Sequence, residues 1–262
     1  MNKKEFFSKK RVIGMVHLLP LPGNASYRGD NKEIEKRALE DAQVLIDSGV
    51  DAIMVENFYD WPQYSTEVSF AAYSLMLKIA TEIRNMTDLP FGVNIEMNAW
   101  VQEWTMAYAV GADFIRIEAF CDNRAGSFGM IEACSTGLMD LQKQLPSDTL
   151  IFSDVHTAET YGFPNVPINN CAQNCINHDS SAIIVTENDD NKRITVDDVK
   201  SMRERIGDFP IIVGAGVKPE NVIGYFEAGA NAVIVGRGFK TGERVDAKLV
   251  TDFMKIVHEH YN

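Results

Sequence analysis

Two glycine-bearing turns near the C-terminal end carry the strongest chemical signal in the sequence. Gly214-Ala215-Gly216 follows the apolar run 211–213, and Gly236-Arg237-Gly238 follows the apolar run 233–235. Glycine lets backbone N–H groups approach a ligand closely, and an arginine can add a charge-assisted hydrogen bond to a phosphate oxygen. Turns of this kind after two successive strands predict a phosphate site, formed here by Gly214, Gly216, Gly236, Arg237 and Gly238.

Ionisable side chains stand at the ends of other apolar runs. Asp154 and His156 close the run 150–155 and are two residues apart, so on a strand they are expected to point together into one site. A carboxylate beside an imidazole can act as general base and proton shuttle. Glu56 and Glu118 close two further runs and are candidates for the partner acid or base. We therefore predict that these four residues carry out proton transfer.

Other polar residues at the same kind of position are expected to bind a substrate. They are His17, Asn57, Asn94, Arg116 and Thr186, and Glu96 also lies at such an end. Arg116 shares a face with Glu118, so an ion pair between the two is an alternative role. His17, Asp154 and His156 could instead bind a divalent metal. No His-x-His or His-x-x-x-His spacing supports a metal site, so we expect neither a metal nor another cofactor.

Short apolar runs alternate with amphipathic helical stretches along the whole chain. The runs are rich in valine and isoleucine and mostly continuous, which is typical of parallel strands covered on both faces. Three segments of similar sequence, 48–53, 110–115 and 228–233, each carry a glycine that can end a helix before the next strand. The predicted strands are 12–17, 52–56, 91–95, 114–118, 150–155, 182–186, 211–214 and 232–236.

Eight strand–helix units in a chain of this length predict an α/β fold, a (β/α)8 TIM barrel. A doubly wound open sheet is the rival, but it would carry its phosphate loop after the first strand. We expect a single domain spanning 1–262, with 1–10 as a short N-terminal extension. Thr195 and Asp198 predict a helix start by a capping box, and Asp246 is expected to cap the last helix.

Composition excludes several classes of protein. The 262 residues carry a formal net charge of −12, whereas binding to nucleic acid needs a surplus of Lys and Arg. No apolar run reaches the roughly 18–20 residues of a membrane span, and residues 1–10 lack the apolar region of a signal peptide. Four cysteines in so long a chain are too few for a disulfide framework. We expect a cytoplasmic protein that does not span a membrane; a homo-oligomer is compatible with the sequence.

Several motifs resemble those of the BtpA/SgcQ family, in the same order and over nearly the whole chain. The opening segment 13–23 (IGMVHLLPLPG) is the most specific of them. The others are 51–57 (DAIMVEN), 90–95 (PFGVNI), 114–117 (FIRI), 214–221 (GAGVKPEN) and 238–240 (GFK). The resemblance implies a ribulose-phosphate-binding-like barrel. One branch of that family is tied to photosystem I biogenesis in cyanobacteria, and another belongs with genes for sugar uptake by phosphotransferase systems.

These observations favour an enzyme that acts on a small phosphorylated metabolite, such as a sugar phosphate, by proton abstraction next to a carbonyl. An isomerase, an epimerase and an aldol-type lyase all fit. The alternative is a non-catalytic assembly or biogenesis factor that uses the barrel as a binding scaffold. A third hypothesis is a glycoside hydrolase using Glu56 and Glu118, which requires two carboxyl groups about 5–10 Å apart.

Overall fold

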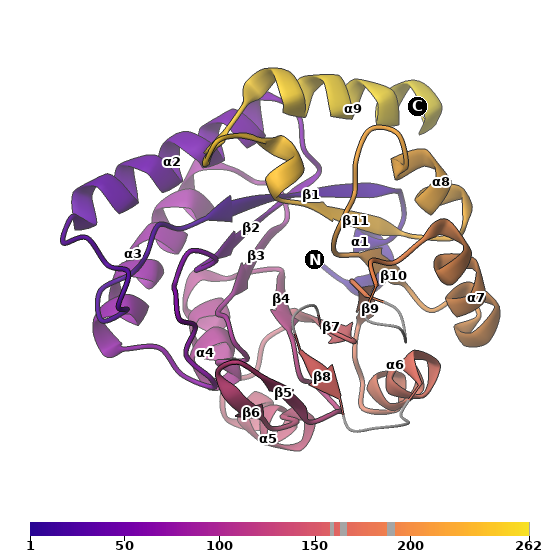
Figure 1. Cartoon of the computed structure of the whole chain (residues 1–262), viewed down its shortest axis with the longest axis horizontal. Coiled ribbons are helices and arrows are strands. Elements are labelled where there is room, and N and C mark those ends of the chain that lie inside the picture. The colour runs from indigo at the N-terminus through magenta and orange to yellow at the C-terminus, as the bar shows by residue number, and fades with distance from the viewer. Residues whose placement is uncertain (158–159, 163–166, 188–191, 262) are drawn as a thin grey trace.

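Eight parallel strands form a closed barrel in the computed structural model, which describes residues 1–157, 160–162, 167–187 and 192–261 (Figure 1). Around the barrel the strands follow the order β1, β11, β10, β9, β7, β4, β3, β2. The (β/α)8 fold predicted from the sequence is therefore confirmed. Each predicted run matches one barrel strand to within one residue at either end: β1 (Arg11–His17), β2 (Ala52–Glu56), β3 (Phe91–Asn94), β4 (Phe114–Ile117), β7 (Leu150–Val155), β9 (Ala182–Val185), β10 (Ile211–Val213) and β11 (Ala232–Val235).

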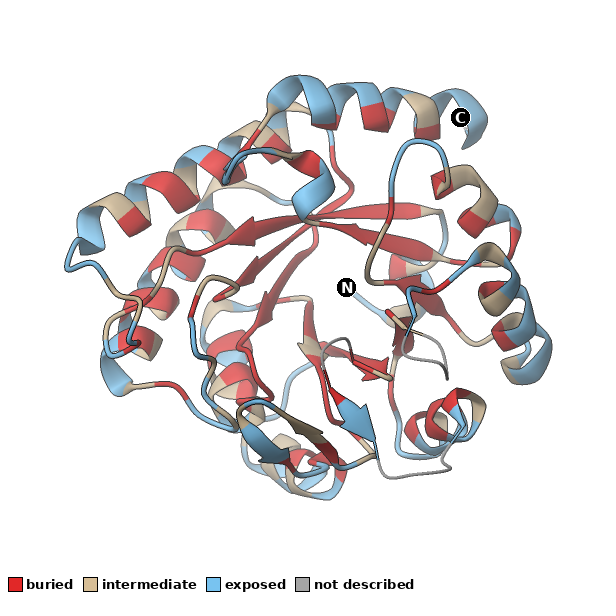
Figure 2. Cartoon of the chain, viewed as in Figure 1, coloured by how far each residue is buried: buried red, intermediate tan, exposed pale blue. Residues whose placement is uncertain are grey.

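Helices surround the barrel and turn their buried residues toward the strands (Figure 2). Both predicted caps are present. Thr195 and Asp198 form the capping box of α7, and the Asp246 carboxylate accepts hydrogen bonds from Lys248 N and Leu249 N at the start of α9, at 2.9 and 3.3 Å. The outer helices are α2 (Asn31–Asp47), α3 (Phe70–Met86), α4 (Trp100–Val110), α5 (Ser135–Gln144), α6 (Ile168–Asn177), α7 (Val196–Ile206), α8 (Val222–Glu227) and α9 (Ala247–Tyr261).

The three similar segments are helix-to-strand junctions that also join neighbouring strands. Their glycines, Gly49, Gly111 and Gly229, have φ of 82°, 66° and 112°, values that favour glycine. Two residues later, an Asp or Asn side chain accepts a hydrogen bond of 3.0 Å from a backbone N–H at the start of the adjacent strand. The pairs are Asp51 with Val12, Asp113 with Phe91, and Asn231 with Ile211. The repeat therefore fixes strand alignment at the N-terminal end of the barrel.

Alternate residues of each strand fill the barrel interior, and this alternation determines which side chains reach the site. On β1, Ile13 and Met15 belong to the interior cluster and His17 is next in register; on β2, Ala52 and Met54 lead to Glu56. On other strands, the same alternation places residues just beyond the strand end on the inward face. Inward positions near the carboxyl ends are His17, Glu56, Asn94, Arg116, Asp154, Thr186, Gly214 and Gly236.

The N-terminal extension closes the opposite end of the barrel. Helix α1 (Lys3–Phe6) inserts the fully buried Phe6 ring against Phe114 and Phe152, with ring centroids 5.4 and 5.2 Å apart. Phe114 in turn occupies the space that a side chain at Gly92 would need, 2.1 Å from the ideal Cβ position. The first ten residues thus form the floor of the interior core. Access to the barrel is left at the carboxyl ends of the strands.

Two small antiparallel units are added to the barrel. Strands β5 (Arg124–Gly126), β6 (Gly129–Ile131) and β8 (Tyr161–Gly162) form a sheet between β4 and α6 in the chain (Figure 1). After β11, the short 3-10 helix η1 (Arg237–Phe239) leads into the hairpin of β12 (Lys240–Thr241) and β13 (Arg244–Val245). Within the described parts of the chain, no helix is long and apolar enough to cross a membrane.

Candidate active site

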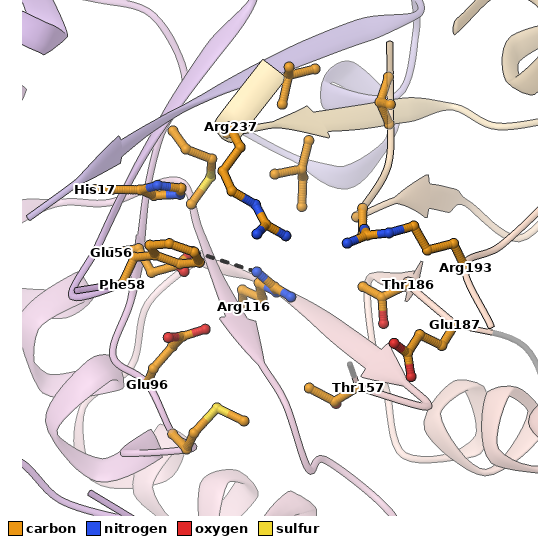
Figure 3. A pocket seen from close by; sticks show the side chains of 18 of the residues that line it. His17, Glu56, Phe58, Glu96, Arg116, Thr157, Thr186, Glu187, Arg193 and Arg237 are labelled. Carbon is orange, nitrogen blue, oxygen red and sulfur yellow. Dashed lines mark ion pairs between the residues drawn. The ribbon is translucent and has the colours of Figure 1, made fainter. Parts of the chain in front are cut away.

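A cavity of about 210 Å³ opens at the carboxyl ends of the barrel strands (Figure 3). Its walls combine ionisable side chains with an apolar base. The lining residues are Met15, His17, Glu56, Phe58, Gln63, Glu96, Met97, Arg116, Thr157, Thr186, Glu187, Arg193, Gly214, Ala215, Val217, Ile234, Val235, Gly236 and Arg237. Polar cavities of this kind at this end of the fold are where TIM-barrel enzymes have their active sites.

One wall of the cavity is formed by the two glycine turns and two arginines. Gly214 and Gly236 line it directly, and the short helix η1 begins at Arg237. Phosphate sites of this fold are frequently formed by such turns together with a short extra helix. Figure 3 shows Arg237 and Arg193 extending into the cavity from different elements. Two guanidinium groups facing one space repel each other unless an anion lies between them. This wall is therefore suited to an anionic group.

Glycine is sterically required at Gly214 and Gly236. An added Cβ at Gly214 would lie 2.6 Å from Ile184 Cγ2 and 2.8 Å from Thr186 Cγ2. An added Cβ at Gly236 would lie 2.7 Å from Cε1 of the His17 ring. The absence of these side chains lets the backbone of both turns approach the cavity, and it leaves the imidazole room beside the second turn.

The opposite wall carries two neighbouring carboxyl groups, Glu56 and Glu96. Glu56 ends β2. Glu96 follows β3, and its backbone N–H donates to Asn57 Oδ1 at 2.7 Å, while Gln63 Nε2 donates to its carboxyl at 3.0 Å. Asn57 also donates to Asp60 at 3.0 Å, so it positions Glu96 and does not line the cavity. This arrangement holds two carboxyl groups together at the mouth of the barrel.

Burial makes both carboxyl groups harder to ionise than exposed glutamates. Burial raises the pKa of Glu56, and burial together with the nearby Glu56 charge raises the pKa of Glu96 further, well above its ordinary value. Arg116, whose guanidinium lies 3.6 Å from Glu56, opposes the increase at Glu56 more strongly. Of the two, Glu96 therefore has the greater tendency to keep its proton, and Glu56 the greater tendency to be charged.

Arg116 is the only described cation in direct ionic contact with these inward carboxylates. Its Nε and Nη2 atoms donate to the two oxygens of Asp154 at 3.1 and 2.9 Å, a bidentate pair. The Asp154 side chain is fully buried behind Arg116 and does not line the cavity. Asp154 thus orients the arginine and neutralises its charge. The predicted pairing of Arg116 with Glu118 is replaced by contacts with Asp154 and Glu56.

Glu118 and Asn94 lie behind the cavity wall. Glu118 accepts hydrogen bonds from Asn94 Nδ2 at 2.6 Å and from Asn98 N at 2.8 Å, and neither Asn94 nor Glu118 lines the cavity. The fully buried Glu103 of α4 accepts from Ile95 N and Arg116 N, both at 3.0 Å. These buried carboxyl groups fix the ends of β3 and β4, which carry Glu96 and Arg116.

Glu118 predicts a measurable pH dependence of stability. Burial raises its pKa from 4.5 to about 8. Between these values the folded chain keeps a proton that the unfolded chain has released, so stability falls as pH rises through this window. The contribution is about 1.4 kcal/mol per pH unit. We expect Glu118→Gln to flatten the pH profile of urea unfolding by about that slope; the exposed control Glu67→Gln should not. An unchanged slope in Glu118→Gln would contradict the assignment.

His17 presents a neutral imidazole to the cavity. Its ring stacks on Phe58 with centroids 4.1 Å apart and planes inclined by 14°. Burial, followed by the positive charges of Lys240, Arg116 and Arg237, lowers its pKa well below 6.5. Its buried Nδ1 has no hydrogen-bond partner among the residues that the structure describes. A neutral imidazole with an unused ring nitrogen can exchange a hydrogen bond with a ligand.

The structure brings only part of the predicted site to the cavity. His17, Glu56, Arg116, Thr186, Gly214, Gly236 and Arg237 line it, whereas Asn57, Asn94, Glu118, Asp154, Gly216 and Gly238 do not. The expectation that Asp154 and His156 point together into the barrel is wrong for His156. Strand β7 ends at Val155 and His156 has φ of 52°, so the strand alternation stops before it. The His156 side chain lines a separate cavity.

Several lining residues have no role predicted from the sequence. Glu96 is recognisable in the sequence as a polar residue at a strand end, and its place two residues after Asn94 indicates the inward face, but no role was predicted for it. Phe58, Gln63 and Thr157 lie in loops beyond strand ends, where no periodicity applies. Arg193 lies beyond β9 in the chain and forms a β-bridge with Glu187, a contact that local sequence does not encode.

Metal binding was the alternative role for His17, Asp154 and His156. The described residues include no group of three or more His, Cys, Asp or Glu side chains that could hold a metal ion. Of the three ligands considered from the sequence, Asp154 is occupied by Arg116 and His156 lies in another cavity. The expectation of no metal or cofactor stays a prediction.

A closed barrel of parallel strands with a polar cavity at their carboxyl ends defines a TIM-barrel protein. Residues 8–259 match the model of the BtpA family, and the chain belongs to this family. An uncharacterised protein of Pyrococcus horikoshii is 33% identical over 256 residues, which cover 96% of this chain and 97% of the relative. The photosystem I biogenesis protein BtpA of Synechocystis is 31% identical over 261 residues, which cover 97% and 90%.

Solved structures of other barrels are similar in fold. Thiamine phosphate pyrophosphorylase of Pyrococcus furiosus superposes with a TM-score of 0.61 at 16% identity, over 97% of this chain and 96% of that one. N-(5'-phosphoribosyl)anthranilate isomerase of the same organism gives a TM-score of 0.59 at 16% identity, over 95% and 99%. At such low identity these likenesses show the fold alone.

Proposed function

We propose that this protein is an enzyme that binds a small phosphorylated metabolite, such as a sugar phosphate, and transfers a proton next to its carbonyl group. One observation carries the proposal: an anion-attracting wall and two buried carboxyl groups face each other across one small cavity. Isomerase, epimerase and aldol-type lyase reactions all share this proton transfer. The geometry supports proton transfer next to a carbonyl group and is compatible with each of these three reactions.

The anionic end of the ligand is assigned to the glycine-turn wall. Arg193 and Arg237 supply charge there, and the turns at Gly214 and Gly236 bring backbone close to the ligand. The names of two structural neighbours, a thiamine phosphate pyrophosphorylase and a phosphoribosylanthranilate isomerase, refer to phosphorylated compounds. That agreement supports a phosphate here, although only the fold is shared.

Proton transfer is assigned to Glu56 and Glu96, in place of the Asp154 and His156 first considered. Arg116 lies 3.6 Å from Glu56 and favours its charged form, and Glu56 Oε2 has no hydrogen-bond partner in the described structure, so Glu56 is assigned as the base that accepts the proton from carbon. Burial raises the pKa of Glu96 well above its ordinary value, so Glu96 is assigned as the acid that gives a proton to the carbonyl oxygen as the enolate forms. Glu118 lies outside the cavity, which disfavours glycoside hydrolysis through Glu56 and Glu118.

Thermal unfolding against a panel of sugar phosphates, inorganic phosphate and the unphosphorylated sugars tests the ligand class. A phosphorylated ligand at about 100 times its Kd should stabilise the fold by about 2.7 kcal/mol and raise the midpoint. Arg237→Glu should abolish the shift, because it replaces a cation of the anion wall with a carboxylate. The exposed Arg205→Glu on α7 makes the same change in net charge away from the cavity and should retain the shift. If no phosphorylated compound raises the midpoint, the proposed ligand class is wrong.

An assembly or biogenesis role is the second candidate. It is favoured by the 31% identity to the photosystem I biogenesis protein BtpA, over 90% of that relative. Such a protein would recognise a protein partner and need not turn over the ligand of its cavity. A stable complex with a membrane-protein assembly, unchanged in Arg237→Glu and accompanied by no turnover of any phosphosugar, would favour this role over the enzyme.

A further inference from the structure

His17 lies at the junction of the two functional walls of the central cavity. Strand β1 pairs with β11 on one side and with β2 on the other, and His17 is the register partner of Glu56. The Cε1–Nε2 edge of its ring faces Gly236 in the second glycine turn, where an added Cβ would lie 2.7 Å from Cε1 and 2.9 Å from Nε2. Figure 3 shows the imidazole extending into the cavity. The ring therefore borders both the glycine-turn wall and the carboxyl pair.

The His17 ring is held in place by packing. The residue is 5% exposed, and its ring stacks on Phe58 with centroids 4.1 Å apart. Tyr59 packs against it edge-on, with centroids 6.1 Å apart and planes inclined by 86°. A side chain that is already fixed loses little conformational entropy when it binds a ligand. His17 is therefore preorganised for contact with one ligand atom.

The chemistry of the imidazole favours a hydroxyl group as that ligand atom. Nδ1 is buried and has no hydrogen-bond partner among the described residues, so a ligand is expected to meet the Nε2 edge beside Gly236. A neutral imidazole presents either an N–H or a lone pair at Nε2, depending on its tautomer. A hydroxyl group both donates and accepts, so it fits either tautomer, whereas carbonyl and phosphate oxygens only accept. Burial and nearby positive charges lower the pKa of His17 well below 6.5, which agrees with a neutral ring.

The register of His17 with Glu56 places this hydroxyl on the reacting carbon. Neighbouring strands of a sheet lie about 4.7–4.9 Å apart, so inward side chains at paired positions can reach two substituents of one carbon atom. Glu56 is assigned to the hydrogen of the carbon next to the carbonyl group. An oxygen substituent of the same carbon is then left for His17.

We propose that the substrate is a phosphorylated α-hydroxycarbonyl compound, and that His17 Nε2 hydrogen-bonds the hydroxyl group on the carbon that loses its proton to Glu56. This inference rests on the proposed function and narrows its substrate class. In the reaction the C–H electron pair forms a C=C bond as the proton moves to Glu56. The carbonyl oxygen takes a proton from Glu96, which is left as a carboxylate, and the product of this step is an enediol. His17 holds the hydroxyl group that the substrate already carried.

Binding of paired compounds that differ only in this hydroxyl group tests the inference. The pairs are dihydroxyacetone phosphate with hydroxyacetone phosphate, ribose 5-phosphate with 2-deoxyribose 5-phosphate, and glucose 6-phosphate with 2-deoxyglucose 6-phosphate. Calorimetric titration of wild type and His17→Ala with both members of a pair isolates the contact between the residue and the hydroxyl group. Wild type should bind the hydroxylated member of at least one pair about 3–10-fold more tightly, and His17→Ala should bind both members equally. His178→Ala, which changes an exposed histidine at the end of α6, is the control and should keep the wild-type difference.

NMR of the wild type with 15N-labelled histidine tests the same contact without a substitution at the buried His17. The ring is identified by its contact with Phe58. The hydroxylated member of the pair should shift the Nε2 resonance of His17 further than the deoxy member does. The resonances of the exposed His178 should stay unchanged with both compounds. Equal shifts of the His17 resonance with both members would contradict the inference.

Failure of this inference is distinguishable from failure of the proposed function. If phosphorylated sugars bind but wild type does not prefer the hydroxylated member of any pair, the hydroxyl contact is wrong and the phosphate site stands. The same conclusion follows if the preference persists in His17→Ala. If no phosphorylated compound binds, both the proposed ligand class and this inference are wrong.

Discussion

Replacing Arg116 with methionine is expected to lower the free energy of unfolding by about 3–5 kcal/mol. Arg116 makes a bidentate ion pair with the fully buried Asp154 and lies 3.6 Å from the buried Glu56. Methionine retains most of the apolar stem, so the change mainly removes the charge. Without it, Asp154 is left as a buried carboxylate with no cation, which costs much more than losing an exposed pair.

Urea unfolding followed by circular dichroism at neutral pH measures this cost. Arg244→Met is the control, because Arg244 and its partner Glu40 are both exposed and the pair is solvated; it should change stability little. Adding Asp154→Asn to Arg116→Met should recover part of the loss by removing the unpaired charge. Equal costs for Arg116→Met and Arg244→Met, or no recovery in the double variant, would show that Asp154 does not depend on Arg116.

The barrel could be predicted because its signals are local and repeated. Each strand is a short apolar run, and Gly49, Gly111 and Gly229 mark the ends of preceding helices. A one-dimensional pattern is sufficient for such elements, since neighbouring strands follow each other in the chain. The role of the Asp or Asn two residues after these glycines was not predicted, because its hydrogen bond is made to an adjacent strand.

The site could be predicted only as far as strand alternation extends. His17, Glu56 and Arg116 continue the inward register of their strands, and all three line the cavity. The sequence alone does not distinguish side chains that line the cavity from side chains that lie directly behind them. Asp154 and Glu118 have the right residue type and register, but the former is covered by Arg116 and the latter is held by two asparagines.

A polar side chain at the carboxyl end of a barrel strand therefore does not always reach the cavity. The inward carboxyl groups of β2, β3, β4 and β7 crowd around one guanidinium, and burial raises the pKa of Glu56, Glu96 and Glu118. A single cation does not offset the burial of all of them, so their pKa values stay above the ordinary value. Of these three carboxyl groups, Glu56 and Glu96 line the cavity and Glu118 does not. Access to the cavity and a raised pKa together favour this pair for the proposed acid–base chemistry.

Replacing Glu56 with glutamine should lower proton transfer at the bound ligand by about 10²–10⁴-fold. Glutamine keeps the size and polarity of the side chain but cannot accept a proton from carbon. Arg116 keeps its bidentate contact with Asp154 in this variant, so the anion wall and the fold are expected to persist. The loss should therefore appear in kcat, with the phosphate-dependent thermal shift retained.

Exchange of hydrogen for deuterium at the carbon next to the carbonyl, followed by NMR in D2O, measures this step without knowledge of the final product. The compound used is the one that gives the phosphate-dependent thermal shift. Glu96→Gln should also slow exchange, because it removes the proton donor to the carbonyl oxygen. Glu67→Gln, an exposed glutamate away from the cavity, should exchange at the wild-type rate. Exchange that persists at the wild-type rate in Glu56→Gln would exclude Glu56 as the base, and no exchange in the wild type with the ligand bound would favour the scaffold role.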